Sequence, residues 1–61
     1  MLINKSSNLA DLAECMGPAA SKSDARPFLA ALLAAGYEGK DSSEIPDGEW
    51  HRIMLEALDP Q

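Results

Sequence analysis

The first regular pattern of hydrophobic and polar positions lies within residues 8–16. Ser7 or Asn8 can accept hydrogen bonds from the first-turn amides of a helix there. Gly17 can close the helix in a left-handed conformation, and Pro18 prevents its continuation. The apolar side chains follow the i, i+3, i+4, i+7 spacing of one helix face, namely Leu9, Leu12, Ala13 and Met16. The pattern therefore predicts an amphipathic helix.

A second helix is predicted over about residues 23–35, and Gly36 closes it. Alanines fill much of this segment and give it a high helix propensity. Pro27 disfavours helical geometry at the residue before it and removes one amide donor. We therefore expect the regular helix to begin at Pro27, after a looser turn that Ser21 or Ser23 caps. Its apolar face carries Phe28, Leu29, Leu32 and Leu33.

A third helix is predicted from about Pro46, because proline suits the first helical position. Acidic residues follow in its first turn, where the helix dipole favours them. The dipeptide Asp59-Pro60 ends the helix. Its apolar face carries Trp50, Ile53, Met54, Ala57 and Leu58.

Residues 37–45 follow neither a helical nor a strand period, and their glycine and serines indicate a polar loop or a short turn. No strand pattern or internal repeat occurs. The predicted fold class is therefore all-α. We expect a compact, helix-turn-helix-like bundle of three, or at most four, short helices in a single domain of residues 1–61. Its expected core consists of Leu9, Leu12, Met16, Phe28, Leu29, Leu32, Leu33, Trp50, Ile53, Met54 and Leu58.

The short length limits how such a fold can be stabilised, since a domain of 61 residues buries only about 60% of its unfolded surface. The single cysteine, Cys15, excludes an internal disulfide, and His51 is the only other soft metal ligand, so we expect no metal and no cofactor. No stretch approaches the roughly 20 apolar residues of a membrane span, and residues 1–3 are too short for a signal-peptide core. These features predict a soluble, cytoplasmic protein with no membrane partner.

Catalysis is the less favoured interpretation of the reactive side chains. Cys15 and His51 could form a nucleophile and its base only if the fold brought them together, and no third residue is marked to orient the base. The simpler expectation places Cys15 half-buried on the first helix and His51 exposed beside Trp50. The four glycines stand apart, so there is no phosphate-binding loop. We therefore expect a binding protein and not an enzyme.

Negative charge is concentrated in one part of the chain, which has ten acidic and five basic residues and a net charge of -5. Within residues 38–49, only Lys40 opposes five carboxylates. A solvated surface is the simplest interpretation. The sharper one is a partner-binding surface that imitates the spacing of phosphates and occupies a basic groove of a nucleic-acid-binding protein. Trp50 beside it is either a contact anchor or, as we favour, a core residue. The predicted partner-binding residues are Glu38, Asp41, Glu44, Asp47 and Glu49.

The first two predicted helices also suggest a helix-turn-helix of the winged-helix kind, in which Lys22 and Arg26 would enter a DNA groove. Asp24 stands between these two basic residues, no wing strands are predicted, and the rest of the chain is acidic. Direct nucleic-acid binding is therefore not expected. A small DNA-binding transcriptional regulator is kept as the alternative function, and a helix-turn-helix used for protein contacts is favoured over it.

Several positions, spread over nearly the whole chain, carry a family resemblance. A short N-terminal tail precedes Leu-Ala-x-x-Met-Gly at 12–17, followed by Asp24-x-Arg26, Leu32-Leu33, the acidic loop to Glu49-Trp50, and a last helix with Glu56. This order of features resembles small phage anti-CRISPR proteins, in particular a family of type I-E CRISPR-Cas inhibitors. Pro27 and the alanine-rich run at 30–35 depart from that family, so no contact residue is carried over from it.

The resemblance implies a phage or mobile-element protein that acts in the host bacterial cytoplasm. It would bind the crRNA-guided surveillance complex, or the recruited nuclease-helicase, and block interference. The leading hypothesis is thus an inhibitor that binds a type I effector subunit with a basic DNA-binding surface and blocks target-DNA binding or nuclease recruitment. A structural accessory protein that forms a homodimer is the third hypothesis.

Overall fold

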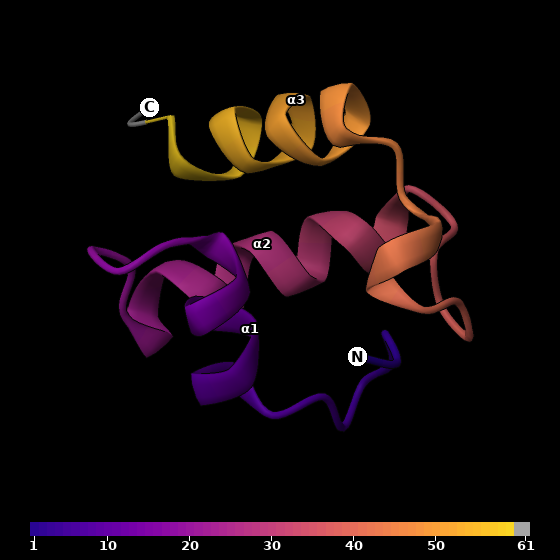
Figure 1. The fold of residues 1–61 in the computed structure, drawn as a ribbon, viewed down its shortest axis with the longest axis horizontal. Coiled ribbons are helices and arrows are strands. Elements are labelled where there is room, and N and C mark those ends of the chain that lie inside the picture. The colour runs from indigo at the N-terminus through magenta and orange to yellow at the C-terminus, as the bar shows by residue number, and fades with distance from the viewer. Residues whose placement is uncertain (60–61) are drawn as a thin grey trace.

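Three α-helices and one short 3₁₀ helix form the fold of the computed structural model, which describes residues 1–59 (Figure 1). The long central helix, α2, packs against α1 on one side and α3 on the other. The predicted all-α bundle of three or four short helices is confirmed. In chain order the elements are α1 (Leu9–Met16), α2 (Lys22–Ala34), the 3₁₀ helix η1 (Ser42–Glu44) and α3 (Asp47–Leu58).

Asn8, one of the two predicted caps, is the N-cap of α1. Its side-chain oxygen accepts hydrogen bonds from the N–H groups of Ala10 (2.8 Å) and Asp11 (3.3 Å). These amides have no acceptor inside the helix, so the cap satisfies them. Ser7 does not cap α1. Its hydroxyl instead accepts from the N–H of Asn4 and donates to the carbonyl of Leu2, both at 2.9 Å.

Gly17 ends α1 in a different conformation from the one we expected. Its φ is 144° and its ψ is 166°, which is an extended geometry with positive φ and not the left-handed helical conformation. The next residue, Pro18, accounts for this difference, because a proline disfavours helical ψ at the residue before it. The N–H of Gly17 still donates to the carbonyl of Ala13, which closes the last turn.

The prediction of a looser turn before Pro27 is wrong, because α2 is regular from Lys22 onward. Ser21 and Asp24 form a capping box, in which the hydroxyl of Ser21 accepts from the N–H of Asp24 (3.4 Å). In return, the carboxylate of Asp24 accepts from the N–H of Ser21 (3.0 Å). Pro27 therefore lies inside the helix. Tertiary packing outweighs its missing donor, because one face is buried at i, i+3, i+4, i+7 spacing: Ala25, Phe28, Leu29 and Leu32.

Gly36 closes α2 as predicted. The N–H of Tyr37 donates to the carbonyl of Leu32 and the N–H of Gly36 donates to the carbonyl of Leu33, both at 3.1 Å. This pair of hydrogen bonds is the Schellman motif. The φ of Gly36 is 91°, a conformation that side chains with a Cβ rarely adopt. The chain leaves α2 here and enters the loop of residues 37–45.

The segment before α1 pairs with the loop after α2. The sequence pattern did not predict this pairing. Three backbone hydrogen bonds join residues 1–3 to residues 39–42, at 2.7 to 2.8 Å. Leu2 and Asp41 form an isolated antiparallel bridge within this pairing. Ile3 is held inside the core by it and has no exposed surface. The predicted loop or short turn is thus ordered by a distant part of the chain.

We had predicted that Pro46 is the first helical residue of α3, but it is the N-cap. Its φ of -59° suits a helix, but its ψ of 144° is extended. The carbonyl of Pro46 accepts the first hydrogen bond of the helix from the N–H of Trp50 (2.9 Å). Asp59, with ψ 119°, ends the helix as predicted. Pro60, the other predicted stop, lies outside the described residues.

The core differs from the prediction at several residues of the predicted helix faces. Leu58 was expected inside and is 40% exposed. Five predicted members pack against the core but are only partly buried: Leu9, Met16, Leu33, Trp50 and Met54. The buried core consists of Ile3, Leu12, Ala13, Ala25, Phe28, Leu29, Leu32, Ile45 and Ile53. Within residues 1–59, no helix has the length and apolar composition needed to cross a membrane.

Candidate functional site

The five predicted partner-binding residues lie on one continuous stretch, from the loop after α2 through η1 to the first turn of α3. This stretch occupies the right-hand side of Figure 1. Lys40 is the only basic residue within it. Three of the five acidic residues are exposed, and Asp41 and Glu49 are half-buried. We name the set the acidic edge: Glu38, Asp41, Glu44, Asp47 and Glu49.

Asp41 and Glu44 serve the local fold as well as contributing charge. They form a second capping box, in which the carboxylate of Asp41 accepts from the N–H of Ser43 (3.0 Å). The carboxylate of Glu44 accepts from the N–H of Asp41 (2.7 Å). Both carboxylates are therefore held in fixed positions by backbone amides at the start of η1. Reversing either charge would disturb the turn itself.

Asp41 also binds a side chain and the N-terminal ammonium group. The hydroxyl of Ser43 donates to its carboxylate (2.6 Å), and the nitrogen of Met1 lies 3.2 Å from its other oxygen. The same ammonium group donates to the hydroxyl of Ser42 (2.9 Å). These interactions, led by the Ser43 hydroxyl and its amide, lower the pKa of Asp41 from 3.8 to about 2. Asp41 is therefore ionised throughout the neutral and mildly acidic range.

Glu49 is paired within α3. Its carboxylate accepts a hydrogen bond from the guanidinium of Arg52, one turn along the helix. Arg52 also binds Glu56, at 3.1 Å and one turn further on. The hydrogen bond that Arg52 donates to Glu49 is the main cause that raises the pKa of Arg52. Glu49 therefore brings a matched positive charge with it and adds less to the field of the acidic edge than its position suggests.

Glu38 and Asp47 are the carboxylates most available to a partner. Both are exposed. Within residues 1–59, no ion pair or side-chain hydrogen bond engages either of them. A cation that approached them would not have to displace an internal partner. These two residues are therefore the part of the acidic edge best suited to binding.

A hollow of about 300 Å³ lies between the N-terminal residue, η1 and the start of α3. Asp41 and Asp47 line it together with Trp50 and Ile45. The indole ring of Trp50 packs edge to face on the buried ring of Phe28, with ring centroids 4.7 Å apart. Trp50 is thus the core-packed residue that we favoured, and its remaining surface lines the hollow.

The chemistry of this hollow suits a cation with an apolar stem. Asp47 on its rim would attract a lysine or arginine side chain, whereas Asp41 is already paired with the N-terminal ammonium group. The ring of Trp50 would contact the guanidinium or the methylene groups. Long-range attraction from the remaining acidic residues would raise the association rate and make it salt-dependent. The arrangement can therefore bind a basic protein surface.

Cys15 and His51 do not meet in the hollow at the acidic edge. Cys15 is exposed, where we had expected it half-buried, and it lines the hollow beside Trp50. Cys15 lies off the helix face formed by Leu12, Ala13 and Met16, which explains the exposure. His51 is exposed, as predicted, and does not line that hollow. Within residues 1–59, no group of three or more His, Cys, Asp or Glu residues is arranged to hold a metal ion.

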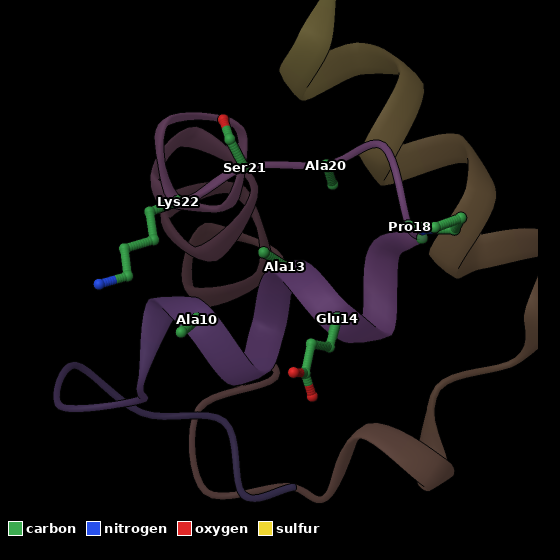
Figure 2. Close-up of a pocket in the computed structure, with 8 residues that line it drawn as sticks. Ala10, Ala13, Glu14, Pro18, Ala20, Ser21 and Lys22 are labelled. Atoms are coloured by element: carbon green, nitrogen blue, oxygen red, sulfur yellow. The ribbon is translucent and has the colours of Figure 1, made fainter.

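A second hollow, of about 450 Å³, lies between α1 and the start of α2 (Figure 2). Small apolar side chains form most of its wall, among them Ala10, Ala13 and Ala20. Its two charged side chains, Glu14 and Lys22, do not converge on a common point in Figure 2. This hollow therefore presents no set of groups suited to catalysis.

The basic residues of the alternative DNA-binding interpretation lie at the start of α2. Lys22 and Arg26 are both exposed there. Arg26 lines a shallow groove together with Lys5, which the sequence pattern did not connect with it. The carboxylate of Asp24 between them is turned to the helix N-terminus, where it accepts from the N–H and hydroxyl of Ser21. Three basic side chains thus gather near one end of α2.

The site residues that the sequence prediction missed are those that hold the acidic edge in place. Ser42 and Ser43 bind the N-terminal ammonium group and Asp41, respectively. The Asp41-x-x-Glu44 spacing is the signature of a capping box and could have located η1. No local pattern could have indicated the part taken by Met1, which lies 40 residues away in the sequence.

A scan against protein-family models, a search of curated proteins and a search of solved structures found no match to this chain.

Proposed function

We propose that this protein is an inhibitor that binds a basic, DNA-contacting surface of a protein partner through the acidic edge. The observation that carries the proposal is the concentration of charge, with five carboxylates and one lysine within residues 38–49. Of these carboxylates, Glu38 and Asp47 are exposed and free of internal partners among the described residues. The hollow beside Trp50 supplies an adjoining place for one basic side chain.

The capping box at η1 supports a binding function because it holds two carboxylates rigidly. Asp41 and Glu44 are fixed by backbone amides at 2.7 to 3.0 Å. Little conformational entropy would be lost when a partner meets carboxylates that are already in place. A rigid, acidic protein of this size can occupy a groove that otherwise holds the DNA backbone.

The partner in this proposal is a type I CRISPR-Cas effector, which the family resemblance implies. Its surveillance complex must expose basic residues to bind target DNA, and phosphate contacts dominate such binding. The acidic edge would compete for those residues. The protein would then act by steric and electrostatic occlusion, without covalent chemistry and without a cofactor.

A mobility-shift assay with purified type I surveillance complex and its target duplex tests this function. We expect the addition of this protein to release the duplex from the complex, and we expect the released duplex to migrate as free DNA. A complex that keeps its DNA at saturating protein would rule out occlusion of the DNA-binding surface. Nuclease recruitment, measured as cleavage of the bound duplex, would then be the step to examine.

A second candidate function, a small DNA-binding regulator, is favoured by the gathering of Lys5, Lys22 and Arg26 near the start of α2. The same assay discriminates it, because a lane that contains only this protein and DNA would show a shifted band. Substitution of Lys22 and Arg26 by alanine should then abolish that shift. We favour the inhibitor because α2 presents few basic residues on a protein whose net charge is -5.

A further inference from the structure

An apolar groove lies on the opposite end of α3 from the acidic edge. It has a volume of about 400 Å³ and runs between the turn after α1 and the C-terminal half of α3. Figure 2 shows Pro18, from this turn, projecting toward α3. The residues that line the groove are Met16, Gly17, Pro18, Ala19, Ala20, Asp24, Met54 and Leu58.

The groove continues onto an exposed apolar strip of α3. Leu58 is 40% exposed and Leu55 is 66% exposed. Leu58 lies four residues after Met54 and three residues after Leu55, so it neighbours both on the helix surface and joins the exposed Leu55 to the wall that Met54 begins. This strip explains why Leu58 is not part of the core.

The charges around the groove indicate what kind of partner fits it. Asp24 lines it, and Asp59 follows Leu58 and is exposed. None of its lining residues is basic. A second copy of this chain would bring a further net charge of -5 against the same acidic rim. A segment with apolar side chains flanked by lysine or arginine meets both features without that repulsion.

We propose that this groove binds the apolar face of a basic amphipathic helix from a partner protein. Met16 and Met54 suit such a ligand because the unbranched thioether side chain adapts its shape to different apolar partners. Leu58 and Leu55 supply the exposed apolar ridge, and a helix docks into such a groove through apolar residues at i, i+3, i+4 and i+7. The groove is a second surface, distinct from the acidic edge.

The test uses a synthetic helical peptide of leucine and lysine, with its leucines at i, i+3, i+4 and i+7. The protein carries ¹³C-labelled methionine methyl groups, which are followed by NMR during the titration. Met16 and Met54 line the groove, whereas Met1 lines the hollow at the acidic edge. We expect saturable shifts of the Met16 and Met54 signals at a lower peptide concentration than any shift of the Met1 signal. Shifts confined to Met1 would place the peptide on the acidic edge and overturn the proposal.

Matched variants and control peptides complete the experiment. Leu58→Lys should weaken peptide binding by about tenfold, because it removes an apolar contact and adds a repelling charge. Ala30→Lys places the same charge on an exposed position of α2 outside the groove and should leave binding unchanged. If Leu58→Lys changes the circular dichroism spectrum, Leu55→Lys replaces it. Equal binding by both matched variants would refute the proposal.

Two further outcomes would also overturn it. Two control peptides should bind weakly: one with glutamate in place of lysine, and one whose leucines are scattered around the helix. The glutamate peptide should bind no better than the scattered one, and tight binding by it would contradict the charge argument. Sedimentation of the protein alone should show a monomer. A dimer that Leu58→Lys dissociates would assign the groove to a second copy. Each of these results leaves the inhibitor function untouched, because that function is tested through Glu38 and Asp47.

Discussion

The indole ring of Trp50 meets the phenyl ring of Phe28 edge to face, with centroids 4.7 Å apart and ring planes at 87°. Phe28 has no exposed surface, whereas Trp50 is half-buried and lines the hollow at the acidic edge. This one contact therefore joins the centre of the core to the candidate binding surface. It also fixes the first turns of α3, which carry Asp47 and Glu49, against α2.

Replacement of Trp50 tests that connection. Trp50→Ala removes a large packed ring and its aromatic contact, so we expect the free energy of unfolding to fall by about 2 to 4 kcal/mol. Trp50→Phe keeps an apolar ring and should cost about 1 kcal/mol. Urea unfolding followed by far-ultraviolet circular dichroism measures both changes. Tryptophan fluorescence cannot be used, because Trp50 is the only tryptophan and both variants lack it. Trp50→Ala with an unchanged urea midpoint would show that the ring does not hold α3 in place.

Much of the fold follows from local patterns in the chain. The helix faces around Leu12, Phe28 and Ile53 repeat at the spacing of a helix, so the three helices and their inner faces could be predicted. Ile3 and Ile45 could not be placed in this way, because Ile3 ends a run of only three apolar residues and Ile45 is a single apolar residue within a polar segment. Ile3 is buried by a backbone pairing with residues 39–42, a non-local contact that no short window contains.

The candidate site was predictable in its composition but not in its geometry. The charge run at residues 38–49 identifies the acidic residues from the sequence alone. The different surroundings of those residues depend on the fold, since Asp41 binds the N-terminal ammonium group while Glu38 and Asp47 bind nothing among the described residues. The helical position of Pro27 was likewise not predictable from local sequence, because burial of the α2 face outweighed a local preference against helix.

Asp41 should give the protein a specific sensitivity to acid. Its pKa is 3.8 in an ordinary environment and about 2 in the folded protein, so the unfolded chain takes up this proton first. The stabilisation from Asp41 is therefore complete above pH 3.8 and is lost as the pH falls through about 2. Asp41→Asn keeps a capping oxygen but removes the charge, and its unfolding free energy should fall less steeply between pH 5 and pH 2.

The comparison for Asp41 is Glu38→Gln, which removes one exposed carboxylate that has no hydrogen bond in the described structure. Urea unfolding at a series of pH values from 5 to 2 measures all three proteins. We expect Glu38→Gln to follow the parent protein over this range. An Asp41→Asn curve that also coincides with the parent would show that the contacts of Asp41 with Ser43 and Met1 add no acid sensitivity.

Pro27 should weaken α2 even though the helix accommodates it. A proline inside a helix leaves the carbonyl four residues earlier, that of Ser23, without its usual donor. Pro27→Ala restores the donor, although it also gives the unfolded chain more freedom. We expect a net gain of about 1 to 2 kcal/mol in the free energy of unfolding. A lower melting temperature for Pro27→Ala would mean that the ring makes stabilising contacts that outweigh the missing hydrogen bond.

Two double variants, compared in the mobility-shift assay with type I surveillance complex, test directly whether the acidic edge displaces DNA. Glu38→Lys with Asp47→Lys reverses the two free carboxylates of the acidic edge. Asp11→Lys with Glu14→Lys makes the same change in net charge on exposed positions of α1. We expect release of the duplex to need about tenfold more of the first double variant than of the parent, with a smaller dependence on salt, while the second double variant acts like the parent. Equal activity of the two double variants would show that the acidic edge does not bind the complex.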